Sequence, residues 1–195
     1  MGTSIHAFIE IDYAENDNPF GDSAEIRSLA TAEFFVWNDY RLFDALANAR
    51  QNAARNARQL CLYAPRGLPE KVSDALFVRH HLMVVDDPLE YVKQQTVFDL
   101  PTQVVLRELA DRWVADGVAR VVKPPWRDEE KSWITNPDWH SVTWFYRHEV
   151  EESLSHAGLE LDKLKPEIPA LLALMRSIDD RLGINHSRLV CWFSN

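Results

Sequence analysis

A histidine and a glutamate on one face of a predicted strand are the residues of this chain best placed for acid-base chemistry. They are His6 and Glu10, in the segment TSIHAFIEIDY near the start of the sequence. Residues of a strand alternate between its two faces, so both polar side chains lie opposite an apolar face formed by Ile5, Ala7, Ile9 and Ile11. Histidine can take up a proton near neutral pH. The pattern predicts His6 as a general base, with Glu10 as its electrostatic partner or as an oxygen ligand.

Other groups of the chain can complete such a site. Arg66 lies in the turn-forming segment APRGLPEKVS and Arg41 lies at the start of a predicted helix, and we expect both to bind an anionic group of a substrate. His140 is expected to act as a second acid-base group, and the adjacent Ser141 is expected to bind substrate. This set suits phosphoester or nucleotide chemistry, so the predicted ligand is an anionic small molecule.

Each of these residues also has a structural interpretation. His6 can hydrogen-bond across a sheet, and Arg66 can pair with an acidic side chain of the protein itself. His140 and Ser141 can belong to an ordinary loop that leads into a helix. Whether the protein is an enzyme is therefore open, and the alternative is a protein that binds another protein without catalysis.

We expect no resident metal ion or cofactor. The α-carbons of His6 and Glu10 would lie about 13 Å apart on a strand, which is too far for comfortable joint ligation. Two alternatives stay open: Glu10 and Asp12 can share a hard cation, and zinc can bind His6 together with distant histidines, namely His80, His81 or His140. The sequence has no Cys-x-x-Cys pair, no Gly-x-Ser-x-Gly and no glycine-rich phosphate loop.

The composition is that of a folded domain. The chain has 195 residues, 46% of them hydrophobic, which is enough for one sizeable core, so we expect a single domain over residues 1–195. The formal net charge of -9 disfavours non-specific nucleic-acid binding, which depends on cationic contacts to phosphates. No apolar run is long enough to span a membrane, so no membrane partner is expected. There is no secretory signal, and the two cysteines form no close-spaced motif, which favours a cytoplasmic location.

Periodicity predicts helices between two terminal strands. The clearest amphipathic helix covers residues 166–182, and further helices are expected from Tyr40, over 74–82, over 102–115 and over 143–157. The closing segment SRLVCWFSN has the content of a strand. We therefore predict an α+β fold with a small, mostly antiparallel sheet that includes both terminal strands, with several helices packed on it.

Residues 120–141 show no convincing periodicity. They contain Trp126, Trp133 and Trp139 among prolines and charged residues, so we expect a long tryptophan-rich loop. Such a loop can cover a site, its tryptophans can pin it to the core, or they can be exposed as anchors for a protein partner.

Five segments occur along the chain in this order: the opening MGTSIHAFIE, the helix DYRLFDALA, the loop Arg66–Pro69, the pair His140 and Ser141, and the ending RLVCWFSN. Together, and in the same order, they resemble a family of uncharacterised proteins found in bacteriophages and prophages. The chain departs from the family at Ser4 and Ser194, where the family has acidic residues. The resemblance implies a phage or prophage protein in a bacterial host cell, and a host protein as the alternative partner, with an anti-defence or regulatory effect.

Overall fold

The computed structural model describes residues 4–12, 28–37, 39–48, 61–87, 89, 103–124 and 131–194. The chain divides into two compact units, and each unit has one four-stranded sheet. Unit 1 combines residues 1–70 with residues 139–195, and unit 2 comprises residues 71–138. A single domain over the whole chain stays a prediction.

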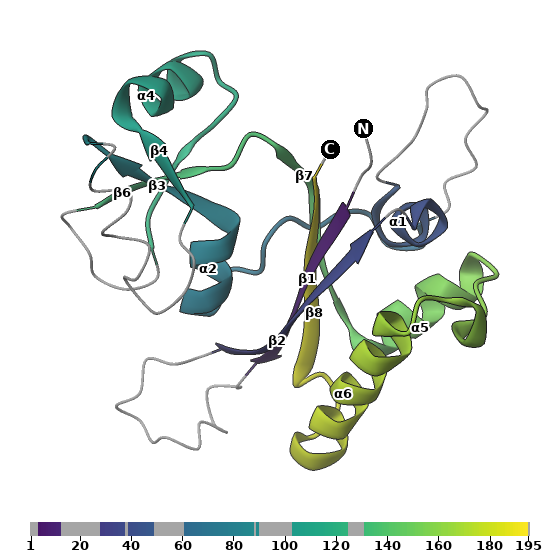
Figure 1. The fold of residues 1–195 in the computed structure, drawn as a ribbon. Helices are drawn as coiled ribbons and strands as arrows, with labels where there is room; N and C mark the ends of the chain where they lie inside the picture. Colours follow the sequence, from purple (N-terminus) through teal and green to yellow (C-terminus); the bar gives the residue numbers. More distant parts are fainter. Residues whose placement is uncertain are drawn as a thin grey trace, which may run out of the picture. The chain divides into compact units, whose positions relative to one another are not determined.

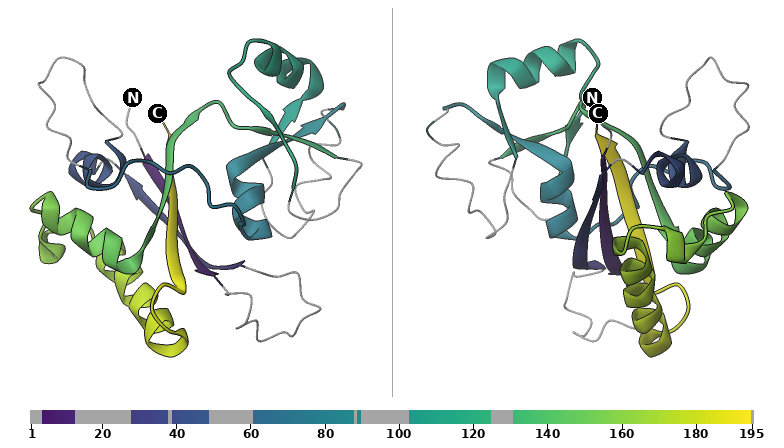
Figure 2. Two further views of the ribbon diagram at one scale, coloured as in Figure 1. Left: turned by 180° about the vertical axis from the view of Figure 1, so that it is seen from behind. Right: turned by 45° about the vertical axis from the view of Figure 1, so that its right-hand side comes forward.

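Both ends of the described chain lie in sheet A of unit 1. Its strands are, in spatial order, β2 (Ser28–Trp37), β1 (Ser4–Asp12), β8 (Ser187–Ser194) and β7 (Trp139–Tyr146). All neighbouring strands are antiparallel. Ser4 pairs with Ser194, so the first and last described strands lie side by side (Figure 2). The predicted pairing of the two terminal strands is confirmed.

Three helices pack on sheet A (Figure 1). They are α1 (Tyr40–Ala47), α5 (Arg147–His156) and α6 (Glu167–Leu182), and the short 3-10 helix η1 (Leu161–Lys163) precedes α6. Their apolar sides meet one face of the sheet in a core that includes Ile5, Ala7, Ile9, Leu189, Cys191 and Phe193. A void of only about 10 Å³ remains beside Ile5 and Leu46, so this core is closely packed.

Unit 2 carries a smaller sheet, sheet B. Its strands are, in spatial order, β4 (Val104–Leu106), β3 (His81–Val85), β6 (Ser132–Thr135) and β5 (Val121–Val122). Strands β3 and β4 are parallel, and the other pairs are antiparallel. Helix α2 (Asp74–His80) leads directly into β3, and α4 (Arg107–Ala115) follows β4. The core of this unit contains Trp133, which is 1% exposed.

The predicted α+β class and the mostly antiparallel sheet are confirmed. The prediction of a loop over residues 120–141 is wrong in the described part, which contains β5, β6 and the start of β7. Strands β5 and β6 have two and four residues, which is too short for an alternating pattern to be recognised in the sequence. They are strands because they hydrogen-bond to residues that are distant in the chain. The helix expected from residue 143 begins at Arg147, because β7 continues to Tyr146.

Cys61 and Cys191 are both buried free thiols. Among the described residues, no helix is long and apolar enough to cross a membrane.

Candidate functional site

The polar face predicted for the first strand is present in β1. Ile5, Ala7 and Ile9 enter the core under the helices, so His6 and Glu10 lie on the opposite face of sheet A. The two polar residues are four positions apart, and each contacts a different part of β8. They do not form one polar cluster.

His6 lies among aromatic rings at one end of sheet A. Its ring is stacked on Trp192, with centroids 5.8 Å apart and planes 8° apart, and the centroid of Trp139 is also 5.8 Å away. The His6 Nε2 atom lies 3.3 Å from Oγ of Ser194 on the neighbouring strand. This is a cross-sheet hydrogen bond of the kind that the structural interpretation of His6 predicts.

Glu10 forms a buried ion pair with Arg188. Both Nε and Nη2 of Arg188 donate to Oε2 of Glu10, at 3.0 and 2.8 Å. The Glu10 side chain is 0% exposed and that of Arg188 is 5% exposed. The carboxylate is therefore bound by an arginine of β8, and the proposed electrostatic pairing of Glu10 with His6 is not what the structure contains.

Arg188 is a residue that the sequence reasoning missed. Its partner Glu10 is 178 positions away in the chain. A signal was available, because Arg188 is the one charged residue in the apolar segment SRLVCWFS, and a charge inside a buried strand needs a partner. Only the register of β1 with β8 identifies that partner as Glu10.

His140 and Ser141 lie together on β7. The His140 Nδ1 atom is 3.1 Å from Oγ of Ser141, and its ring is stacked on Phe193 with centroids 6.1 Å apart. The buried Nε2 atom has no hydrogen-bond partner among the described residues. Since Phe193 belongs to the core under the helices, His140 lies on the opposite face of sheet A from His6. The two histidines do not share a cleft.

The loop that contains Arg66 is attached to an irregular part of β7. The pairing of β7 with β8 shifts between His140 and Thr143, and Ser141 has a φ of 52°, a left-handed conformation that is rare for a serine. The backbone N–H of Gly67 donates to the carbonyl of Val142 at 3.0 Å, and the N–H of Arg66 donates to Oγ1 of Thr143 at 3.3 Å. This loop therefore covers part of the outer edge of sheet A.

Arg66 binds Glu149 in the first turn of α5. Its Nη1 donates to Oε2 of Glu149 at 3.0 Å and its Nη2 donates to Oε1 at 2.5 Å. The guanidinium also lies 5.2 Å from the ring centre of Tyr63 and 4.9 Å from that of Trp144. Two hydrogen bonds and two cation–π contacts fix this arginine between rings.

The pKa shifts of Arg66 and Glu149 both favour the charged form of the side chain. The hydrogen bond to Glu149 raises the pKa of Arg66 above its ordinary value. Burial favours a higher pKa for Glu149, but hydrogen bonds from Arg66 and from the backbone N–H of Tyr146 outweigh it, so the pKa of Glu149 is lowered. Both groups are charged at neutral pH.

A second carboxylate of α5 binds the neighbouring tyrosine. The Tyr63 hydroxyl donates a short hydrogen bond to Oε2 of Glu152, and this bond raises the pKa of Tyr63. We call Tyr63, Arg66, Trp144, Glu149 and Glu152 the Arg66 cluster. It lies at the β7 edge of sheet A, and Tyr63 and Trp144 are both partly exposed.

The remaining predicted groups lie elsewhere. Arg41 is exposed on α1, and nothing described joins it to Arg66. Trp133 is a core residue of unit 2, so it is not an exposed anchor. Trp139 is partly exposed and packs beside His6 in unit 1. Trp126 lies outside the described residues.

The metal alternatives gain no support from the geometry. Within the described part of the chain, no three histidine, cysteine, aspartate or glutamate residues are placed to hold a metal ion. The side chain of Asp12 is outside that part. In unit 2, His80 and His81 are buried with Nδ1 of His80 3.3 Å from Nε2 of His81, and the His81 Nδ1 atom is 3.0 Å from the carbonyl of Phe77.

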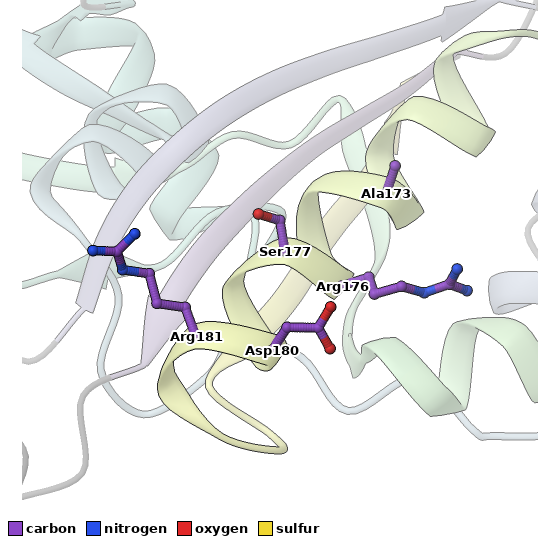
Figure 3. Close-up of a pocket in the computed structure, with 5 residues that line it drawn as sticks. All are labelled: Ala173, Arg176, Ser177, Asp180 and Arg181. Atoms are coloured by element: carbon purple, nitrogen blue, oxygen red, sulfur yellow. The ribbon is translucent and has the colours of Figure 1, made fainter.

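A shallow depression is present on the exposed side of α6. It is lined by Ala173, Arg176, Ser177, Asp180 and Arg181, which all come from this one helix (Figure 3). None of the predicted site residues lines it. Side chains of a single helix do not point toward a common ligand from several directions, as the groups of a binding site do. We therefore assign no site to this depression.

Comparisons of this chain with protein-family models, with curated proteins and with solved structures found no match.

Proposed function

We propose that this chain is a phage- or prophage-encoded protein that binds a host protein in the bacterial cytoplasm and does not itself catalyse a reaction. The observation that carries the proposal is the Arg66 cluster. It gathers a tryptophan, a tyrosine and an arginine at one partly exposed edge of sheet A. These are the residue types that most often dominate binding energy at protein interfaces.

The rigidity of the cluster supports a role in binding. Arg66 is held by Glu149, and Tyr63 is held by Glu152, so these side chains are ordered before a partner arrives. Preorganised side chains lose little conformational entropy on association, which favours affinity. Two of the groups expected to catalyse are instead engaged locally, His6 by Ser194 and Glu10 by Arg188. Arg66, which was expected to bind a substrate anion, is engaged by Glu149.

To test the proposal, the wild-type protein and Trp144→Ala are each immobilised and incubated with lysate of the host cell. The amounts of host protein that each retains are then compared. We expect a specific protein to be retained by wild type and reduced at least tenfold by Trp144→Ala, because a central aromatic anchor contributes roughly 2 kcal/mol or more. Arg181→Ala on the exposed side of α6 is the matched control and retains the partner. Capture that is equal in all three proteins contradicts the proposal.

A second candidate function is hydrolysis of an anionic small molecule or nucleotide at His140 and Ser141. It is favoured by the 3.1 Å contact between the two side chains and by the positive φ of Ser141, since strained backbone is concentrated at functional sites. Phosphoester hydrolysis that is lost in Ser141→Ala, with an unchanged thermal midpoint, supports this candidate in place of binding.

A further inference from the structure

We infer that the segment bound at the Arg66 cluster is basic, that is, a lysine- or arginine-rich stretch of the partner protein. The inference rests on the proposed function and adds the chemistry of the partner. It follows from which charges around the cluster are neutralised inside the protein and which are not.

Helix α5 has three glutamates, and two of them have arginine partners. Glu149 binds Arg66, and Glu151 binds both Arg147 and Arg176. Glu152 is different, because its hydrogen bond within the described part of the chain comes from the neutral hydroxyl of Tyr63. Its negative charge is not balanced by a described cation.

Arg66 cannot supply a free positive charge to an acidic ligand. Both of its Nη atoms donate to Glu149, and its guanidinium plane lies against Tyr63 and Trp144. An anionic ligand would have to break this ion pair and leave the buried Glu149 without its arginine partner, which is costly. The surface at Glu152 is therefore complementary to a cation and not to an anion.

The aromatic rings that continue from the cluster suit the same kind of partner. Trp144 and Tyr146 meet edge to face with centroids 5.3 Å apart, and Tyr146 is stacked with the exposed His148 at 6.1 Å. Lysine and arginine side chains bind aromatic faces through their charge and their alkyl stems. The net charge of -9 also attracts a basic partner over longer distances.

The test uses a fluorescent peptide of alternating arginine and glycine, with a peptide of alternating glutamate and glycine as the comparison. We expect the basic peptide to bind, the acidic one not to bind, and the affinity for the basic peptide to fall with added salt. Glu152→Gln keeps an oxygen for the Tyr63 hydroxyl and removes only the charge. It should raise the dissociation constant up to roughly fivefold, as expected for one exposed ion pair.

The matched control is Asp180→Asn, which removes one exposed carboxylate from α6 and none from α5 (Figure 3). If both variants weaken binding equally, the peptide responds to net charge alone and the inference is wrong. If a captured host protein depends on Trp144 but is insensitive to Glu152→Gln and to salt, the inference fails while the proposed function stands. If no captured protein depends on Trp144, the proposed function itself fails.

Discussion

At the scale of single residues, the pairing of Glu10 with Arg188 explains why a carboxylate on the first strand is not available for catalysis. The two side chains lie on the face of sheet A opposite the helices, and they are almost completely buried. A buried ion pair contributes little compared with apolar residues of the same shape, but removal of one partner leaves an uncompensated charge in a poorly solvated place.

We therefore predict that Glu10→Leu and Arg188→Met each lower the free energy of unfolding by about 3–5 kcal/mol. The double variant Glu10→Leu with Arg188→Met should lose much less than the sum, because no isolated charge remains. Equilibrium unfolding in denaturant measures all three. Strictly additive losses would show that the two side chains do not act as a pair.

At the scale of elements, the important contact is between the Arg66 loop and β7. Gly67 has a φ of 77° and donates its N–H to Val142, next to the shifted pairing of β7. A Cβ atom at Gly67 would meet no atom within 4 Å, so a substitution there tests backbone conformation alone.

We predict that Gly67→Ala lowers the free energy of unfolding by about 1–2 kcal/mol, because an L-residue is strained in the left-handed region. It should also weaken partner capture, since Arg66 is the adjacent residue. Gly158→Ala, with a φ of 65° at the end of α5, is the control for the same strain elsewhere. Denaturant unfolding and capture are compared for both variants, and equal capture by the two would contradict a positioning role for the loop.

Local patterns in the sequence were sufficient for β1 and α6 of unit 1, but not for β7, whose residues were predicted as loop and helix. Alternation identified the polar and apolar faces of β1, and helical spacing identified α6 almost to the residue. The short strands of sheet B were missed because β5 and β6 have only two and four residues. The candidate site was only partly predictable: Arg66 was found, but its partners Tyr63, Trp144 and Glu149 are brought to it by packing across the sheet edge and α5.

At the scale of the whole molecule, the two units are expected to respond differently to acid. In unit 2, burial lowers the pKa of His80 to about 3, with a contribution from His81, and burial lowers the pKa of His81 to about 4. An unfolded chain takes up protons at these residues near pH 6.5, so it binds more protons than the folded unit below that pH.

The two histidines therefore do not reduce the free energy of unfolding of unit 2 above a pH of about 6.5. Below that pH the free energy of unfolding falls, until the pH reaches the pKa values of His80 and His81 in the folded protein. At pH 5 the loss is about 2 kcal/mol for each ring. Hydrogen exchange, corrected for intrinsic rates, should show α2 and β3 losing protection before β1 and β8 as the pH falls from 7.5 to 5. Protection that falls equally in both sheets would contradict the assignment to the buried histidines.

We propose that this protein acts through a partner bound at the Arg66 cluster. The most direct measurement is photo-crosslinking in host cells, with a benzophenone amino acid placed at the exposed position of His148 in one protein and of Arg181 in another. We predict one dominant crosslinked host protein from position 148, lost when Trp144→Ala is added, and no such product from position 181. Identical products from both positions, or products that persist with Trp144→Ala, would contradict the claim.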